Sequence, residues 1–209
     1  LTNYATPIVY NATEGRYGGA FEFDGGGDYV DCGSGDSLIF TGAFTVSTWV
    51  NLNVIDSNPG GIVSNGHSSG YILFYASNYF KFYVNSAGWK IVKYPTTPTA
   101  NQWYHVVGRY DGSDITIYVN GIQGETLSVG SITDYSGVAT GIGVYSMQRK
   151  EMYFNGLIDE VAIYNRSLSS DEIYQQYVSN LNKYDTDKWA LYVNQSLNAS
   201  DGLPDGAYT

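Results

Sequence analysis

The chain has 209 residues, and its 10 Lys and Arg against 20 Asp and Glu give a formal net charge of −10. That balance argues against nucleic acid or an anionic membrane as a partner, because both require clustered cations that release counterions. Without a run of about 18 apolar residues, no membrane insertion is predicted. The length suits one all-β domain with a substantial core, and the missing signal peptide before Leu1 indicates a mature or trimmed form.

The N-terminal part of the chain alternates short β-prone runs with turns. Pro7, in the run of residues 6–10, favours an edge strand. Residues 20–23 alternate in character and predict a strand that ends in the glycine loop of residues 24–28. Two carboxylates and several carbonyls can converge in this loop, as a hard cation such as calcium requires. Alternatively, Asp24 and Asp28 only form turn hydrogen bonds.

Aromatic side chains dominate the next stretch, in a chain that contains 21 Tyr, 8 Phe and 4 Trp. Residues 71–75 and 79–84 are almost continuously aromatic or apolar and are separated by three residues, which predicts a β-hairpin. We expect an exposed aromatic face here that binds a saccharide or a partner chain, with Tyr75, Tyr79, Tyr83 and Trp89 as its glycan-binding residues. The alternative for any single Tyr is an ordinary half-exposed strand position.

Further strand candidates follow at turn-punctuated spacing. They are residues 44–52, 87–94, 103–110, 115–119, 123–129, 139–145 and 152–155. The Asn120-Gly121 pair is the strongest two-residue hairpin signal in the chain. About a dozen such strands predict an all-β fold, a two-sheet antiparallel β-sandwich with one short C-terminal helix and an extended tail.

The chain turns a corner between residues 154 and 173. Residues 157–164 alternate along two faces and predict a strand that carries Asp159 and Glu160 in its middle. Ser169 and Glu172 then have the spacing of a capping box, and Leu168 can pack on Ile173 at the start of a helix. The sequence therefore predicts a strand, a short connection and a helix.

This stretch also carries a family resemblance. The pattern F-x-G-x-I-D-E-V-x-I-Y-N-x-x-L-S-x-x-E-I resembles the end of a laminin G-like, concanavalin A-type jelly roll of microbial cell-surface proteins. Four further motifs match in the expected order, beginning at residues 20, 44, 103 and 117, so that the resemblance covers roughly residues 15 to 180. It implies the jelly-roll fold but no single function, because this fold hosts lectins, glycosidases, adhesion modules and spacers.

The resemblance also implies a structural calcium ion, and it provides a catalytic motif with which this chain can be compared. In such domains calcium is held by the early loop and the late strand, which makes Asp24 and Asp159 the metal candidates. Laminarinase-type glycosidases use E-x-D-x-x-E, of which only Glu22 and Asp24 match here. Asp159 and Glu160 are predicted to point to opposite sheet faces, and the chain has only two His, so we expect no catalytic site.

Cysteine and asparagine provide two smaller expectations. The single cysteine, Cys32, permits no internal disulfide and is interpreted as a buried small hydrophobe rather than a reactive thiol. Sequons for N-glycosylation stand at Asn11, Asn165, Asn194 and Asn198. Such tripeptides also arise by chance in a chain rich in Asn, Ser and Thr.

The C-terminal residues differ in character from the rest. We expect a jelly-roll domain over 1–183 and, over 184–209, an extended tail or the first strand of a truncated Ig-like module. Its β-prone run contains the predicted assembly residues Trp189, Leu191 and Val193. A lone strand cannot bury both faces, so donation to a neighbouring subunit would build a homopolymer.

These observations predict a non-catalytic extracellular module, located outside the cell or at its surface. The first hypothesis is a calcium-stabilised domain for glycan binding or cell-surface adhesion, whose partner is a glycan or another surface protein. The alternative is a structural subunit of an extracellular filament or surface layer, assembled by donation of the C-terminal strand. An enzyme is a distant third.

Overall fold

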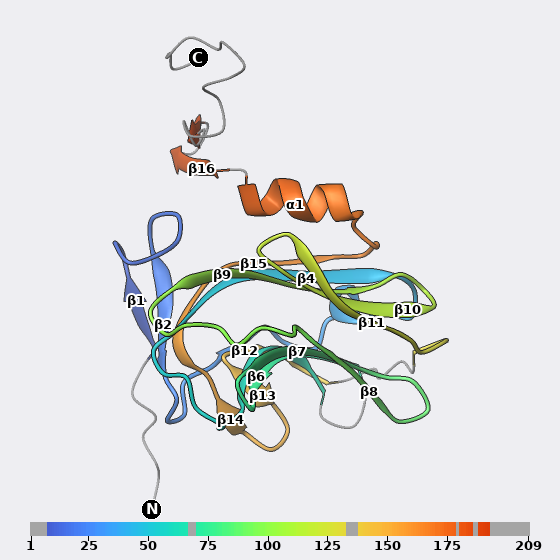
Figure 1. Cartoon of the computed structure of the whole chain (residues 1–209). Helices are drawn as coiled ribbons and strands as arrows, with labels where there is room; N and C mark the ends of the chain where they lie inside the picture. Colours follow the sequence, from blue (N-terminus) through green and yellow to red (C-terminus); the bar gives the residue numbers. More distant parts are fainter. Residues whose placement is uncertain (1–7, 67–69, 133–137, 179, 186–187, 193–209) are drawn as a thin grey trace, which may run out of the picture.

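Two large antiparallel sheets face each other in the computed structural model, which describes residues 8–66, 70–132, 138–178, 180–185 and 188–192 (Figure 1). The seven-stranded sheet has the order β1-β2-β15-β4-β9-β10-β11, and the six-stranded sheet has the order β3-β12-β5-β6-β7-β8. This arrangement confirms the predicted all-β jelly-roll sandwich. Within the described ranges no helix is long and apolar enough to cross a membrane.

The strands are short and many, as the turn spacing predicted. In the seven-stranded sheet they are β1 Val9–Asn11, β2 Ala20–Asp24, β15 Asn155–Tyr164, β4 Phe44–Leu52, β9 Trp103–Tyr110, β10 Asp114–Val119 and β11 Ile122–Ser128. In the six-stranded sheet they are β3 Val30–Asp31, β12 Thr140–Ile142, β5 Gly60–Asn65, β6 Tyr71–Ala76, β7 Tyr79–Asn85 and β8 Trp89–Lys93. A 3-10 turn, Asp36–Leu38, precedes β4.

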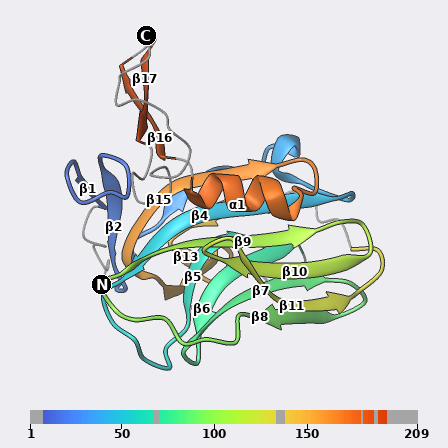
Figure 2. The same cartoon turned by 45° about the horizontal axis from the view of Figure 1, so that its top comes forward.

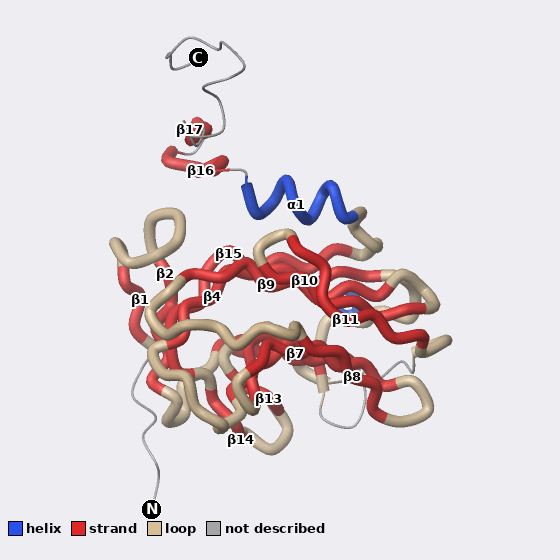
Figure 3. The backbone as a smooth tube through the Cα atoms, viewed as in Figure 1, coloured by secondary structure: helices blue, strands red, loops and turns tan. Residues whose placement is uncertain are grey.

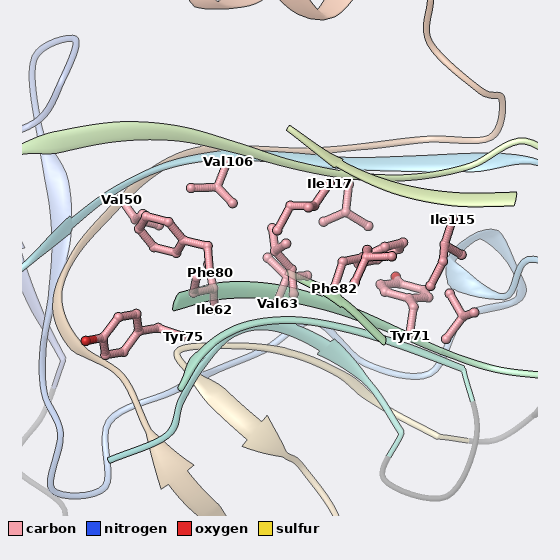
Figure 4. Packing of buried hydrophobic residues seen from close by; sticks show 14 of the residues in the cluster. Val50, Ile62, Val63, Tyr71, Tyr75, Phe80, Phe82, Val106, Ile115 and Ile117 are labelled. Carbon is pink, nitrogen blue, oxygen red and sulfur yellow. The ribbon is translucent and has the colours of Figure 1, made fainter. Parts of the chain in front are cut away.

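The hydrophobic core fills the space between the two sheets (Figure 4). Val50 and Val106 reach into it from the seven-stranded sheet, and Phe80 and Phe82 reach into it from β7. Along β7 buried and half-buried residues alternate, because successive side chains of a strand point to opposite faces. One face of β7 is therefore core and the other is free to carry a function.

Both predicted hairpins form, and each has a two-residue turn, because Ala76 belongs to β6 and leaves only Ser77 and Asn78 between the strands. Asn120 and Gly121, between β10 and β11, both have positive φ, 51° and 75°. Ser77 and Asn78, between β6 and β7, also both have positive φ, 52° and 69°. Two successive positive φ values are the signature of a type I′ turn, whose twist matches the flanking strands.

Helix α1, Ser170–Val178, lies along the outer face of the seven-stranded sheet in both views (Figures 1 and 2). Its capping box is formed, because the Glu172 N–H donates to Ser169 Oγ at 3.1 Å and the Ser169 N–H donates to Glu172 Oε2 at 2.8 Å. Leu168 and Ile173 pack together on strand residues Val107 and Tyr118. The helix and the residues just before it therefore cover the middle of this outer face, over β4, β9 and β10.

Strand β15 departs from the predicted strict alternation. The pairing with β4 shifts register between Asp159 and Ala162, a β-bulge in which Glu160 has a φ of 50°. As a result, Ile158 pairs with Val50 and Ile163 pairs with Val46, so both isoleucines face the core although they lie five positions apart. The expected face assignment beyond Asp159 was therefore wrong.

A second small sheet, β13 Val144–Ser146 with β14 Glu151–Tyr153, lies against the six-stranded sheet (Figure 3). Gly61 of β5 permits this contact, since a Cβ there would overlap the backbone of Val144 and Tyr145. The ring of Tyr145 packs edge-on against Phe74 with centroids 5.2 Å apart. The hairpin covers only part of the outer face of the six-stranded sheet.

The last described strands are β16, Asn180–Asp185, and β17, Lys188–Tyr192, which pair with each other. The run around Trp189 and Leu191 is therefore not the lone strand that we expected, because Lys183 pairs with Trp189 and Leu181 pairs with Leu191. The expected domain boundary after residue 183 falls inside β16. Val193 lies outside the described residues.

Cys32 is exposed, which corrects its interpretation as a buried hydrophobe. It directly follows the two-residue strand β3 at the edge of the six-stranded sheet, and its N–H donates to the Thr140 carbonyl at 2.9 Å. An edge position leaves one side of a strand uncovered, so a side chain there can reach solvent.

Candidate functional site

The outer side of β7 and β8 carries a row of aromatic and basic side chains, which we call the aromatic face. Its members are Tyr79, Lys81 and Tyr83 of β7 with Trp89, Ile91 and Lys93 of β8. The register pairs Lys81 with Lys93, Tyr83 with Ile91, and Asn85 with Trp89, and directly paired residues project from the same side of a sheet. The alternation of β7 turns Phe80, Phe82 and Val84 to the core and thereby sends this row outward.

The aromatic rings of this face form a continuous series. Tyr83 lies between Trp89 and Phe74, with ring centroids 5.2 Å and 4.8 Å apart, and Phe74 contacts Tyr145. Trp89 and Ile91 remain 39% and 38% exposed, which is high for large apolar side chains that neighbour one another. The inner end of the series is buried and rigid, while the Trp89 end is open to solvent.

Tyr75 does not belong to this face, which corrects its predicted place beside Tyr79, Tyr83 and Trp89. It pairs with the core residue Phe80, is 2% exposed and lies at one end of the core (Figure 4). Its hydroxyl donates to the Asp56 carbonyl at 2.9 Å. Nearly every residue of β6 is apolar, so its sequence gives no polar alternation from which the inward positions could be read.

A cleft of about 130 Å³ lies where the loops after β2 and β4 meet strand β15. Its polar lining consists of Asp24, Asp56, Asn58 and Asn155, and Tyr75 and Tyr153 add aromatic side chains to the lining. Asp56 accepts hydrogen bonds from both the backbone N–H and the Nδ2 of Asn58 at 2.9 Å. Carboxylate and amide oxygens beside an aromatic ring can bind sugar hydroxyls or a hard cation.

Of the residues that line this cleft, sequence reasoning identified Asp24 as a metal candidate and Tyr75 as a glycan-binding residue. The available signal for Asp56 was its place in the polar, Pro- and Gly-containing loop between β4 and β5, because loop tips on a rigid scaffold often carry binding groups. Asn155 reaches the cleft because it pairs with Asp24 across β2 and β15. That pairing is non-local, so the sequence contained no signal for it.

Asp24 and Asp159 do not share one site. The register pairs Asp24 with Asn155, so the two carboxylates lie four positions apart along adjacent strands, about 13 Å at the usual rise per residue. Asp159 instead accepts hydrogen bonds from the backbone N–H groups of Tyr17 and Glu160 at 3.2 and 2.8 Å. Burial raises the pKa of Asp159, and burial followed by the charge of Asp159 raises the pKa of Glu160.

The glycine loop forms the turn hydrogen bonds that we considered as its alternative role. Asp24 Oδ1 accepts from the Gly26 N–H at 2.6 Å, and Asp28 Oδ2 accepts from the Asp24 N–H at 3.2 Å. The Asp28 side chain is buried, its Oδ1 has no hydrogen-bond partner among the described residues, and burial raises its pKa. A buried carboxylate oxygen in this state favours a proton or a cation as its neighbour.

Groups suited to catalysis are few in the described part of the chain. His105 is buried and contacts Ser47 at 2.8 Å. No group of three or more His, Cys, Asp or Glu there could hold a metal ion. Of the predicted glycosylation sites, Asn165 is exposed and Asn11 Oδ1 accepts the Thr13 and Glu14 N–H groups. Asn194 and Asn198 lie outside the described residues.

A family model described as the concanavalin A-like lectin/glucanases superfamily matches residues 24–174. No curated protein matches the chain. Among solved structures, domain 4 of AbnA, a GH43 extracellular arabinanase from Geobacillus stearothermophilus in complex with arabinotriose, aligns with a TM-score of 0.65 and 19% identity. The alignment covers 83% of this chain and 82% of that one.

Two toxin binding domains are also similar. The binding domain of Paraclostridial Mosquitocidal Protein 1 aligns with a TM-score of 0.65 and 19% identity, over 83% of this chain and 47% of that one. The binding domain of botulinum neurotoxin serotype G aligns with a TM-score of 0.65 and 14% identity, over 84% and 45%. This chain thus matches less than half the length of either toxin domain, and such identities show a shared fold alone.

Proposed function

The chain belongs to the concanavalin A-like lectin/glucanase superfamily, and from this premise we propose that it is a non-catalytic extracellular module that binds a glycan. The observation that carries the proposal is the aromatic face, where Tyr79, Tyr83 and Trp89 project from the same side of two adjacent strands. The arabinotriose complex of the similar arabinanase domain supports a saccharide as the ligand class.

The chemistry of the aromatic face suits a sugar ring. The C–H groups on one side of a pyranose or furanose are apolar and pack on an aromatic ring, while hydroxyl groups at its edge need hydrogen bonds. Trp89 and Tyr83 supply fixed rings, and Asn85, opposite Trp89, supplies an amide beside them. Because the rings rest on a rigid sheet, little side-chain entropy is lost on binding.

We extend the proposal to the absence of catalysis. A glycosidase needs two carboxyl groups that flank the scissile bond at a defined separation. Asp159 and Glu160 are consecutive in a bulge, and the oxygens of Asp159 accept backbone N–H groups. In the cleft between strand β15 and the loops after β2 and β4, Asp24 and Asp56 likewise accept hydrogen bonds within their own turns. Release of reducing sugar from a bound glycan would contradict this part of the proposal.

Substitution of Trp89 tests the glycan site. W89A is expected to weaken binding about tenfold or more, because a partly exposed aromatic anchor is lost. The matched control is Y174A, which removes an exposed aromatic ring from α1, far from β8 in the sequence. A glycan microarray that includes arabinotriose, followed by calorimetry on the bound sugar, measures both variants.

Two results would contradict the glycan proposal. One is an array on which the wild-type chain binds no saccharide. The other is equal loss of binding in W89A and Y174A, which would place the site away from the aromatic face. The thermal midpoint of W89A, compared with wild type, shows that any lost binding is not lost folding.

Calcium remains a proposal, now centred on the glycine loop. The unpartnered, buried Asp28 Oδ1 supports an ion there, with Asp24 as the second carboxylate. Asp159 is removed from the ligand set by its distance from that loop. A rise in thermal midpoint with added Ca²⁺, lost in D28N, supports this ion, and an unchanged midpoint argues against it.

A second candidate function is a structural subunit of a filament or surface layer. The observation that favours it is the β16–β17 pair, which forms a two-stranded sheet separate from both large sheets among the described residues. Such a sheet presents edge N–H and C=O groups to a neighbouring strand. Electron microscopy of the full chain beside a chain that ends at Val178 tests this candidate.

A further inference from the structure

Lys81 and Lys93 lie directly opposite each other on β7 and β8. Their ammonium groups extend over aromatic rings, Lys81 Nζ at 5.9 Å from the Phe74 centroid and Lys93 Nζ at 5.0 Å from the Tyr79 centroid. Two like charges at directly opposed strand positions destabilise a sheet. The repulsion between Lys81 and Lys93 therefore lowers the stability of the sheet, at surface positions where many neutral side chains would fit.

Among the residues that the structure describes, no carboxylate forms an ion pair with Lys81 or Lys93. In the described part of the chain the only ion pairs are Arg149 with Glu151 and Arg166 with Glu172. The carboxylate in contact with this segment, Glu125 of β11, accepts the backbone N–H of Lys93 and forms no ion pair with either ammonium. What distinguishes Lys81 and Lys93 from the other basic residues is that they lie directly opposite each other on adjacent strands.

The local environment strengthens the attraction of this pair for an anion. Burial, followed by the charge of Lys93, lowers the pKa of Lys81. Both causes describe a cation that is short of water and of counter-charge. An anionic group placed between the two ammonium groups would relieve the repulsion and gain two charge-assisted contacts.

We propose that the aromatic face recognises an acidic glycan, whose carboxylate or sulfate group lies between Lys81 and Lys93 while its sugar rings pack on Tyr83 and Trp89. The lysine row and the Trp89 row lie four positions apart on β7, about 13 Å along the strand, which is the reach of a short oligosaccharide. This inference rests on the proposed glycan binding and specifies its ligand class.

The cationic site contains only two lysines, which argues against nucleic acid as its ligand. Nucleic acid binding requires a track of cations along a phosphate backbone, whereas here two lysines sit within a patch of aromatic and aliphatic side chains. A sugar polymer with one acid group on every ring or every second ring can place one acid group at the lysine pair and a neighbouring ring on Tyr83 and Trp89.

A microarray with matched neutral, uronic-acid-bearing and sulfated oligosaccharides tests the ligand class, with poly-aspartate as a polyanion without sugar rings. Binding confined to acidic oligosaccharides is the expected result, and the two acidic sets distinguish a carboxylate from a sulfate ligand. Preference for neutral sugars overturns this inference but leaves glycan binding standing. Equal binding of poly-aspartate also overturns it. No binding of any saccharide removes the proposed function itself.

Lysine variants locate the charge contact on the bound acidic sugar. K81Q and K93Q are each expected to weaken its binding about fivefold and to reduce the salt dependence of the dissociation constant. The matched control is K90Q, because Lys90 belongs to the same strand but pairs with the core residue Val84 and projects from the other side. Equal weakening in K90Q would show a general charge effect and contradict the assignment.

Stability distinguishes a binding role from a structural one. Removal of one of two repelling charges is expected to leave the thermal midpoint of K81Q unchanged or slightly higher than wild type. A lower midpoint together with weaker binding would mean that Lys81 supports the sheet through its contact with Phe74, and would overturn its role as a ligand contact.

Discussion

At the scale of single residues, the buried imidazole of His105 beneath helix α1 has a strongly lowered pKa. Ser47 Oγ donates to Gln176 Oε1 at 3.0 Å, so His105 Nε2, 2.8 Å from the same oxygen, donates to it. Its Nδ1 has no partner within the described residues, and the ring lies 5.3 Å from Trp49 and 6.4 Å from Tyr177. The imidazole is thus a neutral link between two strands and the helix.

Burial lowers the pKa of His105 from 6.5 to about 4, and this shift predicts a dependence of stability on pH. Between these values the unfolded chain binds a proton at this histidine and the folded chain does not. Its contribution to stability is therefore complete above pH 6.5 and is lost as the pH falls toward 4, by about 3 kcal/mol in all. Urea unfolding at several pH values measures the loss.

Variant H105Q is the control for that histidine, because it removes the titration and keeps a polar side chain beside Ser47. Burial raises the pKa values of Asp159 and Glu160, and raised carboxyl pKa values favour the folded state as the pH falls. The relevant quantity is therefore the difference in slope between the two proteins from pH 6.5 to 4. Parallel curves would show that His105 is not protonated on unfolding.

At the scale of elements, the two outer sheet faces are covered to different extents. Helix α1 packs on the seven-stranded sheet through Ile173, beside Leu168 of the preceding connection, and Tyr177 of the helix stacks on Trp49 at 5.8 Å. On the six-stranded sheet the β13–β14 hairpin covers Phe74 but leaves Trp89 exposed. The position of this short hairpin therefore decides how much of the aromatic face is available to a ligand.

Gly61 is expected to be required for the close contact between β5 and the β13–β14 hairpin. G61A places a methyl group against the backbone of Val144 and Tyr145, which cannot yield as a flexible side chain would. We expect a loss of about 1–3 kcal/mol in the free energy of unfolding and a changed near-ultraviolet circular dichroism as Tyr145 moves from Phe74. The control is G42A, since no atom lies within 4 Å of a Cβ at Gly42. Equal stability of the two variants would show that the hairpin adapts freely.

At the scale of the whole molecule, the family match ends at residue 174, within α1. Strands β16 and β17 pair only with each other among the described strands, so they add no hydrogen bonds to the sandwich sheets. The sandwich is therefore expected to hold its stability without them.

A chain that ends at Val178 tests two expectations together: that the sandwich is stable without β16 and β17, and that the C-terminal pair joins subunits. It is expected to keep the thermal midpoint of the full chain, because the core between the sheets is intact. If the C-terminal pair joins subunits, regular fibres form from the full chain and not from the short one. Dispersed particles in both samples would contradict the filament candidate, and a lower midpoint would contradict the independence of the sandwich.

The sequence by itself determined features that depend on neighbouring residues. The capping box of Ser169 and Glu172, the turn at Asn120 and Gly121, and the hairpin of β6 and β7 arise from local backbone preferences, and all are present. The ordered motifs also identified the jelly roll, because many short alternating strands have few ways to bury their apolar faces.

Only the tertiary structure decided which distant residues meet. The inward side of Tyr75, the bulge at Glu160, the separation of Asp24 from Asp159, and the pairing of Lys81 with Lys93 all depend on strand register. Register is set by the summed fit of whole strands, and a shift of one residue would turn every side chain to the other face. For that reason, the sequence located the aromatic hairpin, while the assembled sheet determined which of its side chains face outward.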